Sequence, residues 1–161
     1  EYILDGGSCT VGVESTVLGF EGGKTLIYRL GGLSQDEIEK VVGKVQLQIN
    51  QSSNPAAPGQ LLQHYAPRKT LYLGQMDDLL QQHADQRVGL LLFNKSRGMK
   101  TEKILSEHGN MSEAARNLFS HLRELDCAEV DCILAERVPE SGLGLAINDR
   151  LSRASVQAAK H

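Results

Sequence analysis

Ser15 and Arg29 are the first residues in this sequence whose types and spacing suggest chemistry. Two strand-like runs, ESTVLGF from Glu14 and KTLIYRLG from Lys24, are separated by a Glu-Gly-Gly turn. If that turn is centred near Gly22, residues whose numbers sum to about 44 lie opposite each other, which sets Ser15 across from Arg29. Because arginine presents a planar fork of donors and serine a short rotatable one, the pair could hold a carboxylate or a phosphate.

A purely structural explanation of Arg29 stays open beside this one. Its guanidinium could pair with Glu14 or cover an exposed face of the hairpin. Two glycine-rich stretches are weaker candidates for binding. The stretch GGSCTVGVEST, from Gly6, lacks the Lys-Ser/Thr ending of a phosphate-binding loop, and SGLGLAIN, from Ser141, lacks the third glycine of a dinucleotide fingerprint. Both stretches are expected to form turns.

His64 and Tyr65 lie in PGQLLQHYAP, a stretch that begins at Pro58 and ends at Pro67. An aromatic residue in such a connector can be a latch that packs on a neighbouring domain. It can also be a lid, because prolines that restrict the chain reduce the entropy cost of laying Tyr65 into a pocket. The residues alone leave the latch and the lid evenly balanced.

The elements that would position these residues fall into two regions. In the first, the hairpin is followed by SQDEIEKVVGKV, in which Ser34 and Glu37 predict a helix capping box, and Ile38, Val41 and Val42 share one helical face. A hairpin and one helix cannot cover both faces of a sheet. The region is therefore expected to end a larger domain, and the chain to be the C-terminal piece of a longer protein.

The second region alternates strand and helix patterns. Strands are predicted at 70–73, 87–93 and 131–137, a short β-like run at 103–107, and helices at 75–83, 110–126 and 144–155. The run VGLLLF is apolar on both of its alternating faces, which is typical of a central strand in a parallel sheet with helices on each side. A small doubly wound α/β domain is expected, joined to the first region by a proline-containing linker over 51–69.

Composition and charge exclude several classes of protein. The chain has 161 residues, 40% of them hydrophobic, and a net charge of −3, so it does not bind nucleic acid as a polycation would. The sequence shows neither a bilayer-spanning apolar run nor a signal-peptide pattern, so a cytoplasmic location without membrane contact is expected. The cysteines have neither disulfide nor zinc-site spacing, and no metal ligands are indicated.

Four motifs, in order, carry a resemblance to a known family. The stretches LDGGSCTVGVESTVLGF, LIYRLGGLSQDEI, APGQLLQHYAP and GLGLAINDRLSRA together resemble the C-terminal part of two-domain threonylcarbamoyl-AMP synthases of the YrdC-like family. The resemblance spans nearly the whole chain. It implies that residues 1–50 end a YrdC-like catalytic domain, that 51–69 form the linker, and that 70–161 form an accessory Rossmann-like α/β domain.

The same resemblance implies an activity. Such enzymes join L-threonine, bicarbonate and ATP, with Mg2+, into threonylcarbamoyl-AMP and pyrophosphate for the threonylcarbamoyladenosine modification of tRNA. By resemblance, Ser15 contacts threonine, Arg29 contacts an ATP phosphate, and Tyr65 closes over the nucleotide. The basic cluster that the family carries near the start of its catalytic domain is missing here. No catalytic residue is therefore expected in this chain, and the chain alone is expected to be inactive.

Two positions depart from the family pattern. Leu30 replaces the usual proline after Arg29, which is expected to loosen the turn that orients the arginine, and Gln60 replaces a usual methionine in the linker. Other proteins of tRNA threonylcarbamoylation are the expected partners. An alternative from a different class stays open: a non-catalytic regulatory α/β module that binds a nucleotide or RNA.

Overall fold

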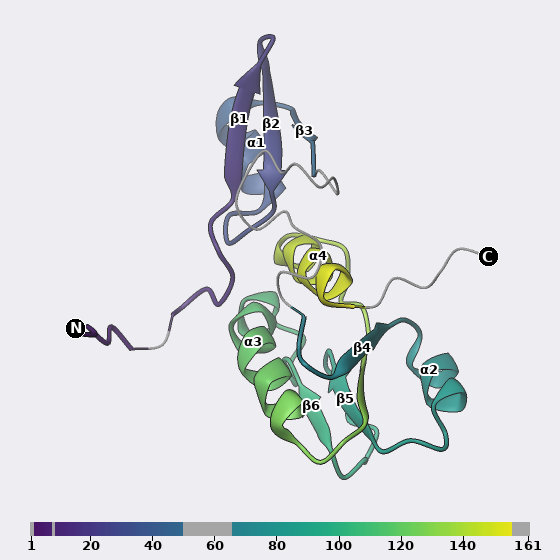
Figure 1. Cartoon of the computed structure of the whole chain (residues 1–161). Helices are drawn as coiled ribbons and strands as arrows, with labels where there is room; N and C mark the ends of the chain where they lie inside the picture. Colours follow the sequence, from purple (N-terminus) through teal and green to yellow (C-terminus); the bar gives the residue numbers. More distant parts are fainter. Residues whose placement is uncertain (1, 8, 50–65, 156–161) are drawn as a thin grey trace.

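Two sheets organise the chain in a computed structural model, which describes residues 2–7, 9–49 and 66–155 (Figure 1). The first sheet has three strands in the order β1-β2-β3, and the second has four in the order β4-β7-β5-β6. His64 and Tyr65 lie outside the described residues. The role of Tyr65 therefore stays a prediction from the resemblance.

The first sheet begins with the predicted antiparallel hairpin of β1 (Val17–Glu21) and β2 (Lys24–Arg29). Its two-residue turn is Gly22 and Gly23, with φ of 55° and 74°. Positive φ at both central residues is what a type I′ hairpin turn requires, and glycine adopts it without a steric penalty.

The register of this hairpin differs from the expected one. Because the turn has two central residues, Glu21 pairs with Lys24, and an irregularity further along sets Val17 opposite Arg29. The prediction that Ser15 is the direct cross-strand partner of Arg29 is therefore wrong. Ser15 lies two residues before β1, beyond the end of the ladder.

The helix α1 (Gln35–Val42) begins where the sequence predicts. The Ser34 side chain accepts a hydrogen bond from the backbone N–H of Glu37, and the Glu37 carboxylate accepts one from the backbone N–H of Ser34 at 3.0 Å. This reciprocal capping box satisfies two backbone donors that a helix start otherwise leaves unpaired. The helix ends at Gly43, whose φ of 77° is unfavourable for other residues.

The first unit, built from β1, β2, α1 and β3, buries only part of the apolar face of α1. Ile38 is buried, whereas Val41 is 84% exposed and Val42 43% exposed, so the predicted apolar face is not a fully buried one. The chain then forms β3 (Val45–Leu47), which pairs parallel to β2. This short strand is not predicted from the sequence, in which Val45 falls at the end of the expected helical stretch and the two residues after it have no assignment.

The second unit is the predicted doubly wound α/β domain. Its elements are β4 (Thr70–Leu73), α2 (Met76–Gln82), β5 (Val88–Leu92), β6 (Glu102–Ile104), α3 (Met111–Cys127), β7 (Cys132–Ala135) and α4 (Leu143–Ala154). All neighbouring strands of its sheet pair in parallel. None of the helices in the described parts of the chain combines the length and apolarity that a bilayer crossing needs.

The two faces of this sheet explain its apolar strands. On β5, Leu90 and Leu92 pack in the cluster that includes Met76 and Leu79 of α2, while Leu91 faces the larger cluster formed with α3 and α4. Successive side chains of a strand point to opposite faces, so a strand covered on both sides is apolar at every position. The central placement predicted for this strand is confirmed, since β5 lies between β7 and β6.

Helix α4 belongs to the cores of both units. Ile147 and Leu151 pack in the large α/β cluster, whereas Ala146 packs with Ile27, Leu30 and other residues of the first unit. Figure 1 shows α4, in yellow, between the hairpin and the four-stranded sheet. The helix therefore joins the two units.

Candidate functional site

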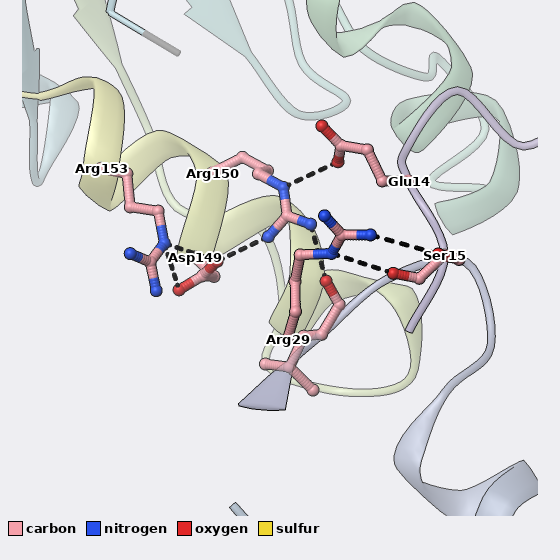
Figure 2. Close-up of polar contacts among 7 residues, drawn as sticks. Glu14, Ser15, Arg29, Asp149, Arg150 and Arg153 are labelled. Atoms are coloured by element: carbon pink, nitrogen blue, oxygen red, sulfur yellow. Dashed lines mark hydrogen bonds and ion pairs between the residues drawn. The ribbon is translucent and has the colours of Figure 1, made fainter. Parts of the chain in front are cut away.

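Ser15 and Arg29 are in contact, although they are not ladder partners. The Arg29 guanidinium donates from Nε to the Ser15 carbonyl oxygen and from Nη2 to Ser15 Oγ, both at 3.1 Å (Figure 2). Ser15 is exposed and Arg29 is half-buried. A hydroxyl and a guanidinium side by side at an accessible position have the donors to bind an anionic group, and that binding stays a prediction.

Two chain segments pack tightly to form this position. The Gly32 N–H donates to the Glu14 carbonyl oxygen at 2.8 Å, and Thr16 Oγ1 donates to the Leu33 carbonyl oxygen at 2.6 Å. A Cβ atom on Gly31 would lie 2.3 Å from the Glu14 carbonyl oxygen, so only glycine fits there. The segment after Arg29 therefore lies directly against the segment that carries Ser15.

The segment before Ser15 rests on the α/β domain. Val13 is buried in the large cluster of that domain. A Cβ atom on Gly12 would lie 2.2 Å from the Arg116 Cα atom of α3, and Gly12 has a φ of 76°. Close packing and positive φ both require glycine here. The position of Ser15 thus depends on contacts with α3 as well as on the hairpin.

Ser15 lines an open cavity of about 400 Å3. Glu14, Thr16 and Cys9 also line it, and the remaining wall is largely apolar, with Val13 and Leu18 among its residues. Backbone N–H groups, that of Gly12 foremost, hydrogen-bond to the Cys9 sulfur and lower the pKa of this thiol. A cavity with polar groups on one side and an apolar wall on the other suits a small molecule with a charged end and a short side chain.

Glu14 and Arg150 also belong to this site, although neither is predicted from the sequence as a member of it. Arg150 on α4 is fully buried, and its Nε donates to Glu14 Oε2 at 3.1 Å. A signal for it exists, because Arg150 lies four residues after Ala146 and next to Leu151, within the buried face of α4. An arginine on the buried face of a helix indicates a buried ion pair, but its partner cannot be identified from helix spacing.

The second glycine-rich stretch proves to be structural. Gly142 precedes α4 with a φ of 52°, and a Cβ atom on Gly144 would lie 1.9 Å from the Pro139 carbonyl oxygen. The two glycines thus serve a turn and a close approach of helix and loop, as the sequence analysis expects.

The described residues offer no metal centre of their own. Within residues 2–7, 9–49 and 66–155, no three histidine, cysteine or acidic side chains gather to hold an ion. Glu14, the carboxylate next to Ser15, already accepts from Arg150. These residues do not fit a protein-built Mg2+ site, and no step of the chemistry is assigned to the ion.

Fold and site together define an α/β protein in which Arg29, at the end of a hairpin strand, contacts Ser15, just before the hairpin, beside a parallel-sheet domain. Comparison with known proteins gives the family. A family model described as the C-terminal domain of threonylcarbamoyl-AMP synthase matches residues 33–156. The chain therefore belongs to this family.

Curated relatives share the same name. The threonylcarbamoyl-AMP synthase of Pyrococcus abyssi is 35% identical over an alignment covering 96% of this chain, and that of Bacillus subtilis is 33% identical over 95%. The chain spans about half the length of these relatives, 49% and 48% respectively.

Two solved structures are similar in fold and sequence. The crystal structure of P. abyssi Sua5 complexed with L-threonine has a TM-score of 0.80 and 34% identity, covering 94% of this chain and 48% of that one. A second structure is of P. abyssi Sua5 with an adjacent histidine and tyrosine both replaced by alanine; its TM-score is 0.80 at 33% identity, covering 94% of this chain and 47% of that one.

Proposed function

We propose that this chain is part of an L-threonylcarbamoyladenylate synthase, which converts L-threonine, bicarbonate and ATP into threonylcarbamoyl-AMP and pyrophosphate. The observation that carries the proposal is the similarity to two proteins of that name over 96% and 95% of the chain. The product would serve the threonylcarbamoyladenosine modification of tRNA. This similarity favours an enzyme over the regulatory or RNA-binding module that the sequence left open.

Ser15 is the proposed threonine contact. It lines the open cavity, and a related protein whose fold matches at a TM-score of 0.80 has been crystallised with L-threonine. The Ser15 hydroxyl can hydrogen-bond to the amino acid, and the apolar wall can take its methyl group. Because Arg29 donates to Ser15 Oγ, the hydroxyl oxygen already has one donor and its own proton can point toward the ligand.

Arg29 is the proposed ATP contact. A guanidinium that makes two hydrogen bonds to one neighbouring residue is held in a fixed orientation, which favours bidentate recognition of a phosphate. Positive charge beside a phosphate also stabilises the charge that develops when a carbamate oxygen attacks phosphorus.

Tyr65 is the proposed lid over the nucleotide, and His64 its neighbour. Support comes from the solved variant of the archaeal relative, in which an adjacent histidine and tyrosine were replaced together. The histidine–tyrosine pair of this chain is His64 and Tyr65. The proposal also includes a cytoplasmic location, Mg2+ supplied with the nucleotide, and other tRNA-threonylcarbamoylation proteins as partners.

The test is pyrophosphate release by the natural protein that contains this chain, measured with L-threonine, bicarbonate and MgATP. We expect release that depends on all three substrates, and none from the 161-residue chain alone. Arg29→Ala should raise the KM for ATP more than that for threonine, and Tyr65→Ala should weaken ATP binding in calorimetry without loss of fold. A natural protein that folds but forms no threonylcarbamoyl-AMP would overturn the proposal.

Cys9 gives an independent readout of the threonine position. It lines the same cavity as Ser15, whereas the exposed Cys127 lies on α3 and is absent from the lining of that cavity. L-threonine should slow alkylation of Cys9 and leave Cys127 unchanged, and Ser15→Ala should require more threonine for the same protection. Equal alkylation of Cys9 with and without saturating threonine would show that the amino acid binds elsewhere.

A further inference from the structure

Arg150 is a fully buried cation, and each of its three guanidinium nitrogens donates a hydrogen bond. Its Nε donates to Glu14 Oε2 at 3.1 Å, its Nη1 to Asp149 Oδ2 at 2.6 Å, and its Nη2 to the Leu30 carbonyl oxygen at 2.7 Å (Figure 2). The side chain has 0% exposure. Burying a guanidinium is costly unless its donors are satisfied, so this residue is held by its partners and holds them in turn.

Two of these partners flank the proposed substrate contacts. Glu14 directly precedes Ser15, and Leu30 directly follows Arg29. They lie 136 and 120 residues from Arg150 in the chain. One planar guanidinium therefore fixes the distance between the two segments that carry the site.

Two carboxylates and two arginines meet around Arg150. Asp149 accepts from Arg150 and also from Arg153, whose Nε is 3.1 Å and 3.0 Å from the two carboxylate oxygens. Glu14, with 35% of its side chain exposed, supplies the second negative charge. Without Arg150, the Glu14 carboxylate would lose this partner next to Ser15, where a substrate carboxylate or phosphate would be repelled.

The position of Arg150 is fixed from the α/β domain. Asn148 Oδ1 accepts from the Val138 N–H at 3.0 Å, and Asn148 Nδ2 donates to the Val138 carbonyl oxygen at 2.8 Å. Both atoms of the amide are thus used to hold α4 on the loop that follows β7. Ala146, one helix turn before Arg150, packs in the cluster that contains Leu30.

We infer that Arg150 is a positioning residue for the proposed threonine and ATP site, through which the C-terminal α/β domain sets the geometry of Ser15 and Arg29. It acts through Glu14 and the Leu30 carbonyl and need not touch a substrate itself. The inference rests on the proposed function and gives the α/β domain a defined part in it. Small displacements of groups that orient substrates lower rates steeply, which makes such a residue detectable.

The test compares three variants of the natural protein. Arg150→Met removes the guanidinium but keeps a similar side-chain volume. Arg150→Lys keeps a buried positive charge beside Asp149 but lacks the planar fork of donors. Arg153→Met is the control, because it removes the other arginine that hydrogen-bonds to Asp149. We expect Arg150→Met to lower kcat/KM for threonine by roughly 10- to 100-fold, mainly through KM. Arg150→Lys should show a smaller loss in the same direction, and Arg153→Met should keep KM and kcat near the wild-type values. Calorimetric binding of L-threonine should follow the same order.

The positioning role of Arg150 can fail without failure of the proposed function, because different results contradict the two. An Arg150→Met protein that folds and keeps wild-type kcat/KM would overturn the positioning role, and so would an Arg153→Met protein with the same loss as Arg150→Met. If Arg150→Met does not fold, Arg150→Lys decides: a raised KM with an unchanged melting temperature supports the role, and wild-type kinetics oppose it. Inactivity of the wild-type natural protein would instead count against the synthase proposal itself.

Discussion

The first unit, which contains β1, β2, α1 and β3 over residues 17–47 and is called the hairpin unit below, buries its apolar surface differently from the α/β domain over residues 70–154. The α/β domain builds most of its own core: helices cover both faces of its sheet, Leu118, Ile133 and Leu134 have no exposed surface, and Val13 is the buried residue that the segment before the hairpin adds to its large cluster. The hairpin unit leaves Phe20 72% exposed, and its small core includes Ala146 from α4 of the other unit. The difference indicates that the stability of the hairpin unit depends on the α/β domain more than the stability of the α/β domain depends on the hairpin unit.

The largest expected effect comes from a cavity in the core of the α/β domain. Leu118→Ala should reduce the free energy of unfolding by about 2–5 kcal/mol, because the side chain is fully buried among α3, α4 and the sheet. Since the hairpin unit shares α4, protection of β2 amides should fall together with that of β5 amides. Urea unfolding and hydrogen exchange measure both.

The matched change in the hairpin unit is Ile27→Ala, at another fully buried position. It should expose β2 amides while those of β5 stay protected. Phe20→Ala, at a largely exposed position, should change stability by no more than about 0.5 kcal/mol. If Ile27→Ala removed the protection of β5 as well, the two units would unfold as one and the dependence would not be one-way.

A smaller effect is expected where the segments of the site touch. Gly31→Ala would place a Cβ atom 2.3 Å from the Glu14 carbonyl oxygen, and backbone atoms cannot move away as a flexible side chain can. We expect a loss of about 1–3 kcal/mol from overpacking, together with weaker threonine binding by the natural protein. The control is Gly74→Ala in the α/β domain, where the nearest atom would be 3.6 Å away. Normal threonine affinity in Gly31→Ala would mean that this contact does not shape the site.

The two units also differ in how much of their structure could be predicted from the sequence. Capping residues, strand periodicity and the parallel sheet follow from local patterns, and Ser34 and the apolar run of β5 indicate them correctly. The hairpin register depended on whether the turn had one central residue or two, and that choice moves every pair by one position.

The two long-range contacts of Arg150, to Glu14 and to the Leu30 carbonyl oxygen, could not be predicted from the sequence. They join residues 120 and 136 positions apart, and no local pattern connects α4 with Glu14 or Leu30. The departure at Leu30 illustrates the same point. Leu30 was expected only to loosen a turn, but its side chain is buried beside Ala146 and its carbonyl oxygen accepts from Arg150.

The smallest expected effect comes from the helix caps, which are equivalent in chemistry but not in context. Ser34 caps α1 of the hairpin unit and Asn110 caps α3 of the α/β domain, each accepting from the N–H of the glutamate three residues on. Replacing either with alanine should cost about 0.5–2 kcal/mol. Asn110→Ala should shift the unfolding of both units, whereas Ser34→Ala should affect only the hairpin unit.

The Ser34 cap should also make the stability of the hairpin unit depend on pH. Hydrogen bonds from the Ser34 side chain and backbone lower the pKa of Glu37 in the folded protein. A carboxyl with a lowered folded pKa contributes stability that is fully present above its unfolded pKa and is lost as the pH falls through the folded value. The wild-type hairpin unit should therefore lose stability on acidification, and Ser34→Ala should lose less over the same range. Hydrogen exchange of α1 amides as a function of pH measures this, and parallel curves for the two proteins would show that the Ser34 side chain does not set the Glu37 pKa.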